Sequence, residues 1–194
     1  MNKDWTGNTN SVFKNLSASN HCEEEREEND FYATNPKSVE ALLQYETFNN
    51  KIYEPCCGRG HISKVLIEHG YNVVSSDLID RGFGDFFGDF LEMTSKNDRD
   101  IITNPPYKYA KEFVEHALDI SQYGTKIAMF LKIQFLEGKA RKELFKKYPP
   151  KIVYVFSERQ ECAKNGNFIG SSAVCYCWFV WQKGYNSDPI IKWI

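Results

Sequence analysis

The sequence predicts an α/β protein built on an open, mostly parallel sheet. Apolar runs of strand length alternate with amphipathic helical patterns, which is typical of a sheet covered by crossover helices. The last two expected strands, 151–156 and 173–182, have no helix between them, so we expect them to pair antiparallel at one edge. The earlier strands are expected at 51–54, 71–77, 100–103 and 127–132.

Helices are expected between most of these strands. The first, at 36–48, has a capping residue at Thr34 or Asn35 and a proline in its first turn. A second helix follows Gly60 and a third covers 108–121. A fourth helix is basic, and its charges form either a solvated face or a track for phosphates. Its cations are Lys139, Arg141, Lys142, Lys146 and Lys147.

Length and composition indicate one globular domain. The 194 residues are too few for two comfortable domains, and 42% of them are hydrophobic. No apolar run approaches the ~20 residues that cross a bilayer, so we expect a soluble protein without a membrane partner. The amino-terminal residues show no signal pattern, so the six cysteines are expected to be reduced thiols in a cytoplasmic protein.

The first 28 residues differ from the rest in charge. Residues 1–30 carry three Lys/Arg and seven Asp/Glu, which leaves 21 basic and 19 acidic residues in the remainder. We expect residues 1–28 to be a disordered acidic leader and residues 29–194 to be the folded domain. The small basic excess of that domain allows a nucleic-acid partner without indicating one.

A glycine turn follows the strand at 51–54. Glu54 ends this strand, and Gly58 and Gly60 allow the backbone to pass close to a ligand. The third glycine of the dinucleotide fingerprint is missing, and a carboxylate at Glu54 would repel a pyrophosphate, so a cationic ligand fits better. Asp77 ends the next strand about twenty positions later, which suits a contact with ribose hydroxyls. The spacing therefore indicates a nucleoside cofactor.

The segment 80–91 is rich in glycine and phenylalanine and is expected to be a loop. Asp89 could accept a hydrogen bond from an adenine amino group, with Phe90 against the ring. The alternative is that Phe83, Phe86 and Phe87 simply fill the core.

The strand at 100–103 ends in Asn104-Pro105-Pro106-Tyr107. The prolines force an extended backbone at Asn104. The Asn104 side-chain oxygen and the Pro105 carbonyl can then accept both hydrogens of an exocyclic amine, while Tyr107 offers a flat face to its ring. The alternative is a rigid turn that closes a strand. Its position after the other two strand ends favours the site.

Taken in order, the glycine loop, Asp77, Asp89-Phe90 and Asn104-Pro105-Pro106-Tyr107 resemble the class I S-adenosylmethionine-dependent methyltransferases. Within that class the chain resembles the small phage-type DNA adenine-N6 enzymes, over 30–194. The resemblance implies one Rossmann-like domain, with a mostly parallel seven-stranded sheet, an antiparallel edge strand and helices on both faces. The chain departs from the pattern in the Cys56-Cys57 pair and in having no separate target-recognition domain.

The resemblance also implies the roles of individual residues. Asn104, Pro105, Pro106 and Tyr107 would be the catalytic motif, which orients and stacks the target amine. S-adenosylmethionine, and its product S-adenosylhomocysteine, would be held mainly by Glu54, Asp77 and Asp89. The full set of expected cofactor contacts is Tyr32, Thr34, Glu54, Pro55, Cys56, Gly58, Gly60, Asp77, Leu78, Asp89, Phe90 and Asn104.

The expected activity is methyl transfer to adenine N6 in DNA. RNA adenine and a protein glutamine amide are alternative acceptors, since the same motif suits any planar amine, and an inactive binding module is a further alternative. No metal is expected, because Cys162, Cys175 and Cys177 lack the spacing of a zinc site. No pattern indicates an oligomeric state.

Overall fold

This computed structural model describes residues 32–158, 160, 162–164 and 174–194, and of residues 32 and 162–164 it describes only the backbone. The expected leader at 1–28 lies outside these residues and stays a prediction. No helix in the described ranges is long and apolar enough to cross a membrane.

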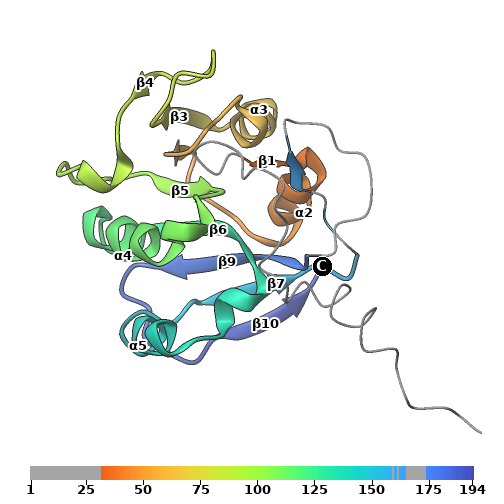
Figure 1. Cartoon of the computed structure of the whole chain (residues 1–194), viewed down its shortest axis with the longest axis vertical. Helices are drawn as coiled ribbons and strands as arrows, with labels where there is room; N and C mark the ends of the chain where they lie inside the picture. The colour runs from red at the N-terminus through yellow and green to blue at the C-terminus, as the bar shows by residue number, and fades with distance from the viewer. Residues whose placement is uncertain (1–31, 159, 161, 165–173) are drawn as a thin grey trace, which may run out of the picture.

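Within the described residues, the main sheet has eight strands in the order β10-β7-β9-β6-β5-β2-β3-β4 (Figure 1). Seven of them run in one direction, and β9 runs against its neighbours β6 and β7. A second, two-stranded sheet pairs β1 (Tyr32–Thr34) antiparallel with β8 (Cys162–Lys164). The main strands are β2 (Lys51–Glu54), β3 (Asn72–Asp77), β4 (Phe86–Phe87), β5 (Asp100–Thr103), β6 (Lys126–Lys132), β7 (Ile152–Val155), β9 (Tyr176–Gln182) and β10 (Ile190–Trp193).

The predicted α/β class and the antiparallel pairing of the last two expected strands are confirmed, since β7 pairs antiparallel with β9. The sheet has eight strands where seven were expected. The extra pairing lies at the two edges. There β10 pairs with β7, and the two-residue strand β4 forms inside the expected loop at 80–91. Both edge strands are exposed, so they lack the alternation of buried and exposed residues that marks a strand in a sequence.

Helices cover both faces of the sheet, as predicted. The alternating side chains of each strand explain this, because Ile101 packs under one helix layer and Ile102 under the other. One layer is α4 (Ala110–Ile120) with α5 (Lys139–Lys147), and the other is α2 (Pro36–Tyr45) with α3 (His61–Glu68). Short 3-10 turns occur at η2 (Phe90–Glu92), η3 (Tyr107–Tyr109) and η4 (Ile133–Leu136).

Two helix boundaries differ from expectation. Asn35 is the N-cap of α2, and its side chain accepts from the Lys37 amide at 3.0 Å, as the sequence allowed. The helix ends at Tyr45, however, because Glu46 is extended, and Phe48 is buried from the connection that follows. Likewise α4 begins at Ala110, since the Asn-Pro-Pro motif leads first into η3.

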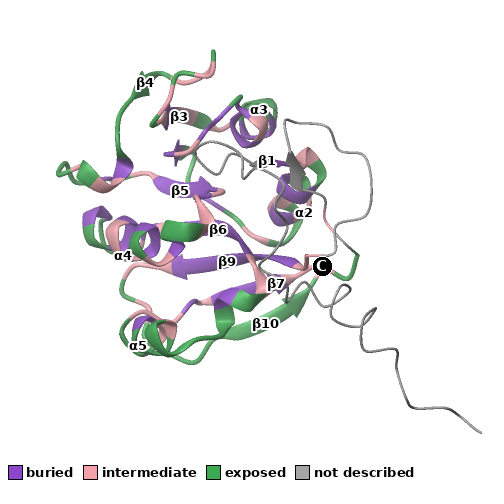
Figure 2. Cartoon of the chain, in the orientation of Figure 1, coloured by how far each residue is buried: buried purple, intermediate pink, exposed green. Residues whose placement is uncertain are grey.

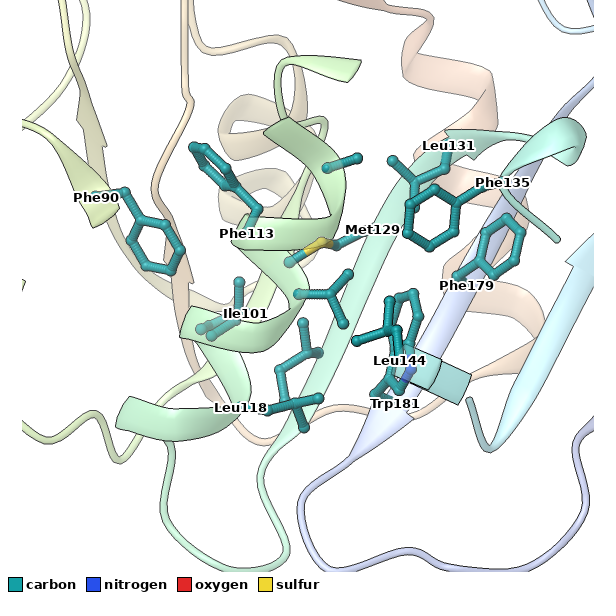
Figure 3. Packing of buried hydrophobic residues seen from close by; sticks show 14 of the residues in the cluster. Phe90, Ile101, Phe113, Leu118, Met129, Leu131, Phe135, Leu144, Phe179 and Trp181 are labelled. Carbon is teal, nitrogen blue, oxygen red and sulfur yellow. The ribbon is translucent and has the colours of Figure 1, made fainter. Parts of the chain in front are cut away.

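The core lies on the two faces of the sheet. The central strands are buried, while β10 is exposed along its length (Figure 2). Under α4 and α5, Phe113, Met129 and Phe179 belong to one continuous hydrophobic cluster (Figure 3). On the other face the buried Trp178 donates its indole N–H to the Ser38 carbonyl at 2.7 Å, which joins β9 to α2. This rigid sheet holds the strand ends that form the site.

Candidate active site

The four parallel strands β2, β3, β5 and β6 end at one edge of the sheet, where open α/β folds bind their ligands. A cavity of about 1130 Å³ lies there. It brings together most of the residues that the sequence singled out. Those lining it are Thr34, Glu54, Pro55, Cys56, Asp77, Leu78, Asp89, Phe90, Asn104, Pro106 and Tyr107.

Three expected residues are not part of the lining, namely Gly58, Gly60 and Pro105. Gly58 acts through its backbone, which donates to the Asp77 carboxylate at 2.7 Å. Gly60 has φ of +77°, and a Cβ there would lie 2.6 Å from the ring of Phe83. In the described structure, the absence of a side chain at Gly60 therefore allows the Phe83 ring to pack closely against the backbone. The side chain of Tyr32 is outside the described residues.

Asn104 is held at the end of the fully buried strand β5. Its side-chain amide donates from Nδ2 to Thr34 Oγ1 at 3.0 Å. Thr34 is itself 2% exposed, at the end of β1, so this contact fixes the plane of the amide in the cavity. The orientation makes Oδ1 the acceptor that the Asn104 amide presents.

Tyr107 rests on a stack of aromatic side chains from other strands. Its ring centre lies 6.0 Å from that of Tyr176. Tyr176 in turn stacks on the buried Phe130, with 5.0 Å between ring centres and 13° between ring planes. The ammonium of Lys132 lies 5.1 Å from the centre of the Tyr107 ring, within range of a cation–π contact. Tyr107 is therefore part of a rigid aromatic wall.

Asp77, the last residue of β3, organises the glycine loop. Its Oδ2 accepts from the Gly58 amide at 2.7 Å, and its Oδ1 accepts from the Ile79 amide at 3.1 Å. A carboxylate has about four lone-pair sites, so these two bonds leave capacity for the hydroxyls of a ligand. The arrangement can hold a ribose.

Glu54 is buried, with 1% of its surface exposed. Ser63 donates a hydrogen bond to its Oε2, and Ser63 and Ser75 share a hydrogen bond of 2.6 Å. Burial raises the pKa of Glu54 to about 8, against the lowering effect of the Ser63 hydrogen bonds, and the charge of Asp77 raises it further. A cationic ligand in the cavity would favour the ionised carboxylate.

Asp89 and Phe90 are placed by the turn η2. Asp89 Oδ1 accepts from the Leu91 amide at 2.8 Å and caps the turn. Phe90 is 3% exposed, and its ring lies 5.1 Å from Phe113, so it lines the cavity as part of the core. By contrast, Phe86 and Phe87 are 43% and 44% exposed. The alternative that they fill the core is wrong, because this segment forms the sheet edge.

The cysteines of the glycine loop are protonated thiols at neutral pH. Burial raises the pKa of Cys56 well above its usual range, and the negative charge of Asp77 raises it further. Burial likewise raises the pKa of Cys57 to about 12. Neither thiol is suited to act as a nucleophile. Among the described residues no group of three His, Cys, Asp or Glu side chains could hold a metal ion, and the Cys162 side chain is outside them.

The cavity also contains residues that the sequence did not indicate. Lys132 lies on β6 and Tyr176 on β9. The sequence around each residue contains no motif that indicates a binding site. Only the position of Lys132 at the end of an apolar strand could have suggested it. The other unexpected lining residues are Ala33, Cys57, His61, Ile62, Ile79, Arg81, Leu91, Lys108, Tyr109, Phe113 and Val174.

Solved structures share this architecture. A protein of Listeria monocytogenes, provisionally assigned as a class I S-adenosylmethionine-dependent methyltransferase, matches with a TM-score of 0.57 at 12% identity, over 82% of this chain and 64% of that one. A protein of Pyrococcus horikoshii, provisionally assigned as an RNA methyltransferase, matches with a TM-score of 0.57 at 14% identity, over 91% of this chain and 98% of that one. The chain therefore shares its fold with these two solved structures.

A third solved structure with this fold comes from Vibrio vulnificus, where it is provisionally assigned as a modification subunit of a type I restriction enzyme. It matches with a TM-score of 0.58 at 13% identity, over 95% of this chain and 50% of that one. The chain thus spans about two thirds of the Listeria protein and half of the Vibrio protein. Sequence comparison matches the chain to no protein-family model and to no curated relative.

Proposed function

We propose that the protein transfers a methyl group from S-adenosylmethionine to the N6 amine of adenine in DNA. The observation that carries this proposal is the placement of Asn104. Its amide is oriented by Thr34 and lies in the same cavity as Glu54 and Asp77, next to the Tyr107 ring. The motif Asn104-Pro105-Pro106-Tyr107 resembles that of enzymes that methylate planar amines, and the fold supports the same reading.

The residues of the cavity fit S-adenosylmethionine. Asp77 retains acceptor capacity for ribose hydroxyls, and Glu54 is a buried carboxyl that a positive ligand would ionise. Asp89 is available at the adenine end, and Thr34 borders the space near Asn104. When bound, the cofactor supplies a methyl group on a positively charged sulfur.

The acceptor amine is a poor nucleophile, because its lone pair is delocalised into the ring. The two acceptors would be Asn104 Oδ1 and the carbonyl of Pro105, which lies between the lining residues Asn104 and Pro106 but is not itself part of the lining. By holding both amine hydrogens they would localise that pair. They would also stabilise the positive charge that develops on nitrogen, which is an interaction that grows toward the transition state. Tyr107 would hold the ring in line. No strong base is needed, since the product ammonium can lose its proton to solvent.

A base in duplex DNA must leave the stack to reach this cavity. The aromatic wall of Tyr107 and Tyr176 would compensate part of that loss by stacking against the extruded base. RNA adenine and a glutamine amide have the same planar amine, so the acceptor must be identified by experiment.

The test is incubation with S-adenosylmethionine that carries a labelled methyl group, in separate reactions with DNA, RNA and protein acceptors. Digestion to nucleosides should give labelled N6-methyladenine from DNA, and the Asn104→Ala protein should give none above background. Label on cytosine only, on RNA only or on protein only would refute the proposed acceptor. Absence of S-adenosylmethionine binding would refute the proposed cofactor.

A further inference from the structure

The charges that line the cavity are separated into two sides. Glu54, Asp77 and Asp89 come from the ends of β2 and β3 and from the start of η2. Lys108 and Lys132 come from the segments that end β5 and β6, around Tyr107. Arg81 is the exception among the described cations, since it lies in the connection after β3. The acidic side suits a cationic cofactor, and the basic side suits an anionic acceptor.

Lys132 is half-buried at the end of β6. Within the part of the chain that the structure describes, its ammonium forms no ion pair, whereas Lys126 at the other end of the same strand pairs with Glu46 at 2.5 Å. A partly buried cation loses hydration, and the face of Tyr107 at 5.1 Å replaces only part of it. Among the described residues no anion pairs with the Lys132 ammonium, so a bound ligand can supply one.

The Tyr107 ring and the strand that carries Lys132 are both anchored in the core. Tyr176 is 7% exposed and supports Tyr107, and Phe130 beneath it is completely buried. Lys132 itself extends from a strand that pairs with β5 and β9 on its two sides. The strand thus places the ammonium over the ring of Tyr107, at the aromatic wall on which the target base would stack.

We propose that Lys132 binds a phosphodiester next to the target nucleotide. Lys132 would then make the phosphate contact, and the adjoining Tyr107 would make the base stack. The inference rests on the proposed function, because a glutamine side chain would bring no anion to this ammonium. A lysine ammonium is well suited to bind phosphate as a point charge. Lys132 is then an acceptor-binding residue that distinguishes a nucleic acid from a protein acceptor.

The test measures binding without methyl transfer. A labelled DNA duplex, or RNA of the same sequence, is titrated with protein saturated with S-adenosylhomocysteine, over about 50 to 200 mM salt. Lys132→Gln should weaken nucleic-acid binding about 3- to 10-fold at low salt and reduce the slope of log K against log salt by about one. Lys132→Arg should restore the slope. The affinity for S-adenosylhomocysteine should be unchanged in both variants.

Lys96→Gln is the matched control. Lys96 is exposed in the connection before β5, at the end of the strands opposite the cavity. It donates to the Asp119 carbonyl at 3.1 Å. This variant loses the same charge and should bind nucleic acid as the wild type does, with the same salt slope.

An unchanged slope in Lys132→Gln, an equal change in Lys96→Gln, or a wild type that binds neither DNA nor RNA would overturn the inference. Loss of S-adenosylhomocysteine binding in Lys132→Gln would overturn it too, by placing Lys132 on the cofactor side. The proposed function fails separately, because label on cytosine or protein would refute it without altering the binding result. The DNA and RNA reactions show which nucleic acid supplies the phosphate.

Discussion

The chemistry depends on single side chains whose roles can be separated. Asn104 is fixed by Thr34, while Tyr107 rests on Tyr176. Asn104→Ala should lower kcat by about two orders of magnitude or more, because it removes a hydrogen-bond partner that acts mainly in the transition state. Tyr107→Ala should weaken acceptor binding by about 1 to 3 kcal/mol, the contribution of a base stack, and Tyr107→Phe should keep most of the activity.

Steady-state kinetics, with cofactor affinity measured by calorimetry, checks this pair. Both variants should bind S-adenosylhomocysteine about as tightly as the wild type. If Asn104→Ala keeps its kcat and only KM rises, the amide positions substrate and does not stabilise the transition state.

Asp77 is the residue on which cofactor binding should depend most directly. Asp77→Ala removes a charged acceptor for the ribose and should weaken binding by about 1.5 to 3 kcal/mol, as measured by calorimetry. Asp77 also accepts from the Gly58 and Ile79 amides, so part of this loss could come from the loop. Asp80→Ala is the control, because Asp80 accepts from the Gly82 amide outside the cavity. Wild-type affinity in Asp77→Ala would place the ribose elsewhere.

At the scale of elements, helix α3 has a glycine at each end, and the two differ in their surroundings. Gly60 has φ of +77° and lies under Phe83. Gly70 has φ of +85°, and no atom lies within 4 Å of the position that a Cβ would occupy there. Gly70→Ala should cost about 1 kcal/mol through its backbone conformation alone, and Gly60→Ala about 2 kcal/mol or more. Denaturant unfolding measures both values.

Phe83 provides the check on this explanation. In the Phe83→Ala background, Gly60→Ala should cost no more than Gly70→Ala, because the ring that the new methyl group meets is gone. If both glycine substitutions lower the free energy of unfolding equally in the wild-type background, the Phe83 ring can move aside at no cost. It would then lose its contact with the Lys64 ammonium at 5.3 Å.

The elements themselves were predictable to different degrees. The cap at Asn35, the buried strand at 100–103 and the helices after Gly60 and Gly138 follow from local patterns and are confirmed. The strands β4 and β10 were missed. Each has no buried face in the structure, so it depends on hydrogen bonds to a neighbouring strand that its own sequence does not reveal.

For the whole molecule, Glu54 should make stability depend on pH. Its pKa of about 8 in the folded protein exceeds the ordinary value of 4.5. Between these values the unfolded chain releases the proton and the folded protein keeps it, so the free energy of unfolding falls as pH rises. The slope from this residue is at most about 1.4 kcal/mol per pH unit, and its contribution is fully present only below the ordinary value.

Denaturant unfolding between about pH 5 and pH 8, in the absence of ligand, measures this dependence. Glu54→Gln keeps the shape of the neutral carboxyl and removes the titration, so the two proteins should be closest in stability near pH 5, and the wild type should fall progressively below the variant as pH rises. Parallel pH profiles would show that Glu54 is ionised throughout.

Sequence alone determined the alternation of strands and helices and the polar residues that end β2, β3 and β5. These features are local, because the spacing of hydrophobic residues and the positions of glycine and proline influence the conformation of neighbouring residues. The sequence could not determine which distant side chains share a site. Asn104 meets Thr34 across 70 residues, Lys132 reaches Tyr107 from the adjacent strand, and Phe83 covers Gly60. These contacts exist only once the sheet has assembled, since its strand order brings together segments that no local pattern relates.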